Sequence, residues 1–146
     1  MENQAVKAGT VLAVGLTGAV CGWFGWLLAI FVGCLVLDYL TGTAKAMKEG
    51  DWCSAVAREG IWHKLGSIVA VGVACIADVV TGILVGSMAL PLPGEYTALI
   101  APVVTVWYIV TELGSVVENA EALGAPIPGV LRKVIRGLHK AADSEE

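Results

Sequence analysis

Four acidic side chains stand at or inside apolar stretches of this sequence, where carboxylates are unexpected and could do chemistry. Asp38 ends one apolar stretch, Asp78 lies near the middle of another, and Glu112 and Glu118 follow the last one. Paired carboxylates can carry out general acid–base catalysis. Neither a nucleophile placed beside a base nor a glycine-rich phosphate loop accompanies them. We therefore predict that the protein is not an enzyme and uses no cofactor.

Thiols are the other candidate groups. The cysteines are Cys21, Cys34, Cys53 and Cys75. None of them forms a Cys-x-x-Cys pair, and only His63 and His139 could assist as metal ligands. A zinc site needs paired ligands at short spacing. We predict no metal site and interpret the cysteines as small apolar side chains in a membrane protein.

The composition indicates an integral membrane protein. The 146 residues are 57% hydrophobic and 15% charged, whereas soluble domains are about 45–50% apolar and about 25% charged. The mean hydropathy is +0.78. A soluble chain of this composition would expose apolar patches that aggregate. The net charge of −4 argues against binding to nucleic acid, because phosphates call for a basic surface.

The first apolar stretch allows two interpretations. Residues 8–37 carry no charge, and as one helix they would extend about 45 Å, beyond the hydrocarbon core of about 30 Å. One strongly tilted helix or a hairpin of segments 6–22 and 26–42 would fit. We favour the hairpin because Gly22-Trp-Phe-Gly-Trp26 can bend and can lie at the interface. A cleavable signal peptide fits poorly, because its apolar region is usually about 7–15 residues long.

Two further apolar stretches, 65–90 and 96–111, are separated by the turn sequence 91–95. The sequence thus predicts an all-α membrane protein with three to four spans. Basic residues occur between the first two apolar regions and in the tail, but not in the turn. By the positive-inside rule the first loop and the C-terminus are cytoplasmic. The N-terminus is cytoplasmic in the hairpin interpretation and external in the single-helix one.

Helical spacing places Asp78 on a face with small and partly polar neighbours. The other members of this face are Ser67, Val71, Ala74, Thr81 and Val85. A carboxylate in mid-membrane is costly and should face protein or water. Either it lines a pore or a subunit contact, or it is a structural side chain hydrogen-bonded between helices. The pairs Gly18/Gly22 and Gly82/Gly86 have the G-x-x-x-G spacing that lets helices approach closely in lipid.

The polar segments are amphipathic. In segment 51–64 we expect Trp52 to rest on the membrane while Arg58 and Lys64 face lipid headgroups. A polar stripe continues the last apolar stretch, and Gly124 with two prolines should end that helix. Its members are Glu112, Ser115, Glu118 and Asn119. The tail 128–142 is basic and amphipathic, and we expect its cations to contact anionic headgroups. These cations are Arg132, Lys133, Arg136 and Lys140.

Several motifs in order resemble the toxin-secretion and phage-lysis holins of Gram-positive bacteria and their phages. They are Leu-Asp38-Tyr-Leu-Thr-Gly42, Gly60-Ile-Trp-His-Lys64, Asp78, Tyr108-Ile-Val-Thr-Glu-Leu-Gly-Ser-Val-Val-Glu-Asn119 and Leu123-Gly-Ala-Pro-Ile-Pro128. The resemblance covers roughly residues 22–138.

The resemblance implies one holin domain over 1–146 that forms homo-oligomeric lesions in the bacterial cytoplasmic membrane. Endolysin would reach peptidoglycan through them, or a toxin would leave the cell. In this interpretation the acidic residues Asp38, Asp78, Glu112 and Glu118, with Ser115 and Asn119, act in packing, pore lining or gating. A small ion or solute transporter is one alternative, although the spans show no clear internal repeat. The other is a membrane adaptor that recruits a partner through its basic tail.

Overall fold

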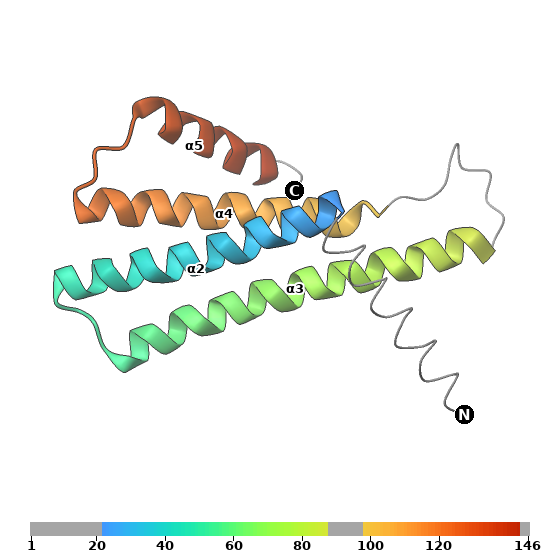
Figure 1. The fold of residues 1–146 in the computed structure, drawn as a ribbon, viewed down its shortest axis with the longest axis horizontal. Helices are drawn as coiled ribbons and strands as arrows, with labels where there is room; N and C mark the ends of the chain where they lie inside the picture. Colours follow the sequence, from blue (N-terminus) through green and yellow to red (C-terminus); the bar gives the residue numbers. More distant parts are fainter. Residues whose placement is uncertain (1–21, 88–97, 144–146) are drawn as a thin grey trace.

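The computed structural model describes residues 22–87 and 98–143, and within them all regular structure is helical (Figure 1). The helices are α2 (Trp23–Glu49), α3 (Ser54–Ser87), α4 (Ile100–Leu123) and α5 (Gly129–Asp143). The predicted all-α class is confirmed.

Three of these helices, α2, α3 and α4, are long and apolar enough to cross a membrane. They contain the described parts of the predicted segments 26–42, 65–90 and 96–111, apart from residues 98 and 99, which precede α4; residues 88–90, 96 and 97 lie outside the described residues. The predicted segment 6–22 lies outside the described residues except for Gly22, and so does the turn 91–95. The choice between a hairpin and a single helix therefore stays a prediction.

Glycines in the left-handed conformation end two of the helices. Gly50 has φ 81° and Gly124 has φ 96°. At each site the glycine N–H and the following N–H donate to carbonyl groups of the last helical turn, which is the Schellman arrangement. The predicted end of the helix at Gly124 is confirmed. The segment predicted as the first loop is mostly helical, since only residues 50–53 separate α2 from α3.

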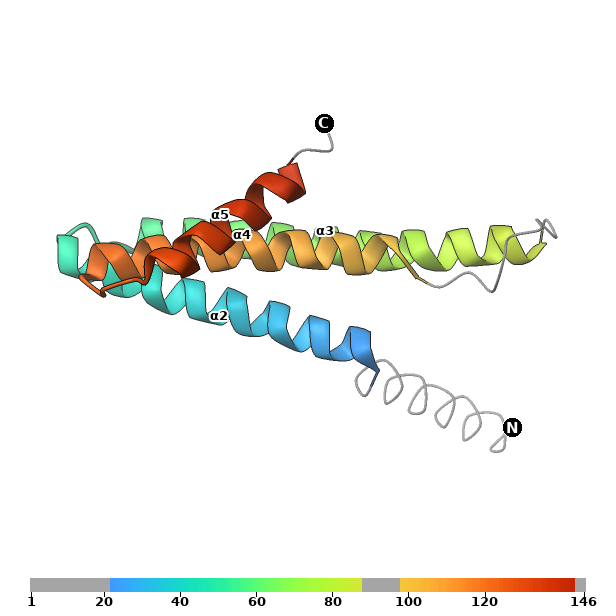
Figure 2. The ribbon, with the colours of Figure 1, turned by 90° about the horizontal axis from the view of Figure 1, so that it is seen from above.

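Helix α4 is the central element of the bundle. It packs along α2 and also against α3, whereas α2 and α3 make few contacts with each other (Figures 1 and 2). The core is small and consists of Phe31, Cys34, Leu35, Val71 and Ile109. The predicted face of α3 is the one that packs inward, because Ser67, Val71, Ala74 and Asp78 are buried and Thr81 and Val85 are half-buried.

Most large apolar side chains of the three long helices face outward. Examples are Trp26 and Ile30 on α2, Ile76 and Ile83 on α3, and Val103 on α4. Such a surface is suited to lipid or to other membrane helices and not to water. Together with the lengths of the helices, it supports a multi-pass membrane protein.

The basic residues gather at one end of the bundle. The C-terminal ends of α2 and α4 and the N-terminal ends of α3 and α5 meet there (Figure 1). Six of the eight lysines and arginines among the described residues belong to these segments, and the other two, Arg136 and Lys140, lie further along α5. The loops that the positive-inside rule assigns to one side of the membrane therefore also lie together in space.

Candidate functional site

A charged junction joins the three long helices near this basic end. The Lys64 Nζ of α3 donates to Asp38 Oδ2 of α2 and to Glu112 Oε2 of α4, each at 2.7 Å. The three side chains are 14%, 19% and 13% exposed, in the order Lys64, Asp38, Glu112. One ammonium group thus holds two carboxylates from different helices in a largely dry position.

An amide completes the junction. The Asn119 Nδ2 of α4 donates to Asp38 Oδ1 at 3.0 Å and to Thr41 Oγ1 at 3.4 Å. Both oxygens of the Asp38 carboxylate therefore have partners on neighbouring helices. Gly42 lies beside this amide, and a Cβ atom there would meet Asn119 Nδ2 at 3.5 Å, an ordinary van der Waals contact.

The position of the junction follows from the sequence pattern. Asp38 and Glu112 come at the ends of the apolar parts of α2 and α4, and Lys64 immediately precedes the apolar part of α3. Because α3 runs antiparallel to the other two helices (Figure 1), the three boundaries coincide. A charged side chain at the edge of the hydrocarbon region needs a polar partner. Here the neighbouring helices supply that partner.

A cavity of about 400 Å³ lies beside the junction, between the three helices. Polar side chains that line it include Thr43, His63, Thr111 and Ser115. The contacts of the junction are ion pairs and hydrogen bonds between side chains of the described helices. The junction fixes the relative positions of three helices through a single cation.

Asp78 forms a second polar contact, between α3 and the beginning of α4. Its Oδ1 accepts hydrogen bonds from the backbone N–H groups of Leu99 at 3.1 Å and Ile100 at 3.0 Å, and its Oδ2 accepts one from Ala101 at 2.7 Å. The first N–H groups of a helix have no partner within the helix, and the helix dipole favours a negative charge there. Asp78 thus caps α4 from another helix.

The depth of this cap explains why a carboxylate is needed. From Ile100 to Glu112, α4 rises about 18 Å at 1.5 Å per residue, less than the hydrocarbon thickness of about 30 Å. We therefore expect α4 to begin inside the apolar region, where no water can satisfy its N–H groups.

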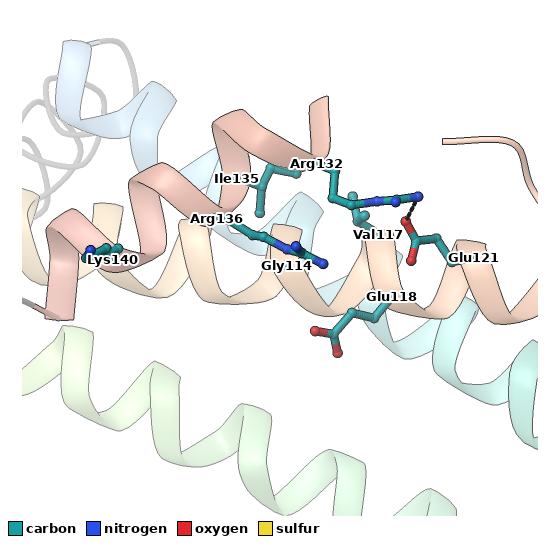
Figure 3. Close-up of a pocket in the computed structure, with 8 residues that line it drawn as sticks. All are labelled: Gly114, Val117, Glu118, Glu121, Arg132, Ile135, Arg136 and Lys140. Atoms are coloured by element: carbon teal, nitrogen blue, oxygen red, sulfur yellow. Dashed lines mark ion pairs between the residues drawn. The ribbon is translucent and has the colours of Figure 1, made fainter. Parts of the chain in front are cut away.

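A third contact holds α5 on the polar half of α4. Arg132 Nη2 pairs with Glu121 Oε1 at 2.6 Å, and the buried Ile135 packs against Gly114. Nearby, Lys48 Nζ of α2 donates to the Ala122 carbonyl at 2.9 Å, at the end of α4. Figure 3 shows the cavity of about 440 Å³ between α4 and α5, which Glu118, Arg136 and Lys140 also line.

The structure separates the predicted site residues into three groups. Asp38, Glu112 and Asn119 meet at the junction, and Ser115 lines the cavity beside it. Asp78 lies apart, at the start of α4. Glu118 lines the cavity under α5.

Among the predicted packing glycines, Gly86 has no heavy atom within 4 Å of a Cβ position, and Gly82 lines a small cavity with Asp78. Gly22 directly precedes α2, and Gly18 lies outside the described residues.

The expectation for Lys64 was wrong, because its ammonium group turns inward to two carboxylates instead of facing lipid headgroups. The sequence did contain a signal for a position at the edge of the membrane: Lys64 is the last charged residue before the apolar stretch 65–90, in which Asp78 is the one charged residue. The partner of Arg132, Glu121, was also missed.

Comparison with known proteins shows the family. The chain is 36% identical to an uncharacterized protein of Halalkalibacterium halodurans, with 84% of this chain and 87% of the relative covered. It is 33% identical to an uncharacterized 14.9 kDa protein in the nagH 3′ region of Clostridium perfringens, with 95% and 98% covered. No solved structure matches the chain. A family model described as the bacteriophage holin family matches residues 15–140, which include the junction, the Asp78 cap and nearly all of α5, and the chain therefore belongs to the bacteriophage holin family.

Proposed function

We propose that this chain is a holin that oligomerises in the bacterial cytoplasmic membrane and forms lesions there. Endolysin reaches the peptidoglycan through these lesions, or a toxin leaves the cell through them. The observation that carries the proposal is the family match over residues 15–140, which includes three helices able to cross a membrane. No covalent chemistry is involved.

The packing of the protomer supports assembly. Its core contains few residues, and α2 and α3 make few contacts with each other. An apolar groove between these two helices, lined by Val32, Val36, Leu65 and Ile68 among others, is open to the outside. A protomer of this kind can exchange lipid contacts for contacts with other copies at little cost, because both surroundings are apolar.

The charged junction supplies rigidity within each protomer. It ties α2, α3 and α4 together at one level, so that the three helices move as one unit when copies associate. The junction thereby keeps its polar groups away from lipid.

The basic end of the bundle, with the C-terminus, lies in the cytoplasm in this proposal. Lys45, Lys48 and Arg58 surround that end together with Arg132 and Lys133 at the beginning of α5. Clustered lysines and arginines close to membrane spans are retained on the cytoplasmic side.

Inducible expression in a bacterium that contains a cytoplasmic muralytic enzyme without an export signal tests the proposal. We expect a delay, then abrupt depolarisation, release of the folded enzyme and a fall in culture density. In the same cells, with the four native cysteines replaced by serine, a membrane-impermeant thiol reagent should label Ser144→Cys only after the lesions open. Steady growth with an intact membrane potential would remove the holin proposal and favour an adaptor. Selective, saturable flux without cell death would favour a transporter.

A further inference from the structure

Helix α5 carries an apolar face that nothing in the described part of the chain covers. Val130, Val134 and Leu138 are 74%, 52% and 48% exposed, and they recur at intervals of four residues. The buried Ile135 lies beside this face and holds α5 on α4. Helix α5 therefore packs on α4 through Ile135, and the apolar face formed by Val130, Val134 and Leu138 stays exposed.

Basic side chains occupy the opposite face of α5 and do not all have the same role. Arg132 is engaged with Glu121. Arg136 and Lys140 line the cavity between α4 and α5, and neither makes an ion pair with a described residue (Figure 3). Lys133 does not line this cavity.

The cavity combines apolar walls with excess positive charge. Gly114, Val117 and Ile135 form apolar wall, and the two cations Arg136 and Lys140 stand against the single carboxylate of Glu118, since Arg132 and Glu121 neutralise each other. In Figure 3 the Arg136 guanidinium lies near Gly114 and Lys140 lies at the other end of the cavity, so each cation can bind a phosphate oxyanion at its own end.

The short connection between α4 and α5 favours a lipid headgroup over free phosphate as the source of the anion. Only residues 124–128 separate α5 from the end of α4, a helix able to cross a membrane. The amphipathic helix consequently cannot lie far from the bilayer surface. An apolar line with a basic opposite face is the pattern of a helix that lies in the headgroup region of an anionic membrane.

We infer that α5 binds anionic phospholipid: Val130, Val134 and Leu138 insert among the acyl chains, while Arg136 and Lys140 bind lipid phosphates along the cavity against α4. The inference rests on the membrane location in the proposed function and not on lesion formation. Of the four basic residues of α5 that the sequence predicts to contact headgroups, the inference assigns Arg136 and Lys140 to the lipid site.

Hydrogen–deuterium exchange on the full-length protein in nanodiscs tests this inference. In phosphatidylglycerol nanodiscs we expect the amides of residues 131–141 to exchange at least about tenfold more slowly than in phosphatidylcholine nanodiscs, because lipid binding holds α5 in place. The amides of α4 serve as the internal reference and should be equal in both lipids.

Two double variants separate the site from general charge attraction. Arg136→Gln/Lys140→Gln should abolish the protection by phosphatidylglycerol. The control Lys45→Gln/Lys133→Gln removes the same number of charges outside the cavity and should retain it. Equal loss in both variants would overturn the site, because binding would then depend only on total charge.

Inorganic phosphate added to phosphatidylcholine nanodiscs distinguishes the two sources of the anion. We expect no protection of α5 from it. Protection as strong as that by phosphatidylglycerol would overturn the assignment to lipid, and so would equal exchange of α5 in both lipids. These outcomes are independent of the lysis experiment, so that failure of either proposal can be recognised separately.

Discussion

Replacement of Lys64 by methionine should lower the free energy of unfolding by about 3–5 kcal/mol, the usual cost of removing one partner of a buried ion pair. The Lys64 ammonium group lies 2.7 Å from both Asp38 and Glu112. Methionine keeps much of the length of the side chain but leaves two carboxylates facing each other without a cation. Unfolding of the purified protein in mixed micelles, followed by circular dichroism, measures this loss.

Two further variants show whether the loss comes from the charge. Lys45→Met removes a lysine of α2 that makes no ion pair with a described residue, and it should have little effect. In the triple variant Asp38→Asn/Lys64→Met/Glu112→Gln no charge remains, so most of the lost stability should return. A triple variant as unstable as Lys64→Met would contradict the electrostatic explanation.

Substitution of Asp78 by leucine should release the beginning of α4. The variant leaves the N–H groups of Leu99, Ile100 and Ala101 without the carboxylate that accepts them. Each unsatisfied buried donor costs about 1–3 kcal/mol, and no water is present in hydrocarbon to replace the acceptor. In hydrogen–deuterium exchange these three amides should lose their protection, and the lysis delay should change.

Asparagine at position 78 provides a graded comparison. Its single carbonyl oxygen can accept from Leu99 and Ile100, but its NH₂ group would face the N–H of Ala101, so its effect should be intermediate. Ser67→Ala, on the same buried face of α3, removes a hydroxyl that bonds only within its own helix and serves as a control. Normal amide protection and a normal lysis delay in both Asp78 variants would contradict the cap and end the gating hypothesis.

The sequence predicted those helices and helix ends that a single local feature, such as an apolar stretch or a terminating glycine, marks. Long apolar stretches located the three long helices, the buried face of α3 was read correctly from helical spacing, and Gly124 marked the end of α4. These features depend on local preferences and on the apolar solvent, which a single sequence expresses directly.

The tertiary partners were not predictable in the same way. The acceptor role of Asp78 depends on backbone N–H groups about twenty positions further along the chain, and no side-chain pattern marks backbone donors. Lys64 turns inward because of the register between α3 and its antiparallel neighbours. The sequence of segment 88–97, which joins α3 to α4, does not determine that register. Only the structure shows that Asp38, Lys64 and Glu112 occupy one level.

The central claim, that this chain alone opens large lesions, is tested most directly with purified full-length protein and liposomes. The liposomes would contain both a small dye and a folded muralytic enzyme, and release of the two would be followed together. We predict that dye and enzyme leave together above a threshold ratio of protein to lipid. Release of dye while the enzyme stays inside, or no release at any ratio, would contradict the account.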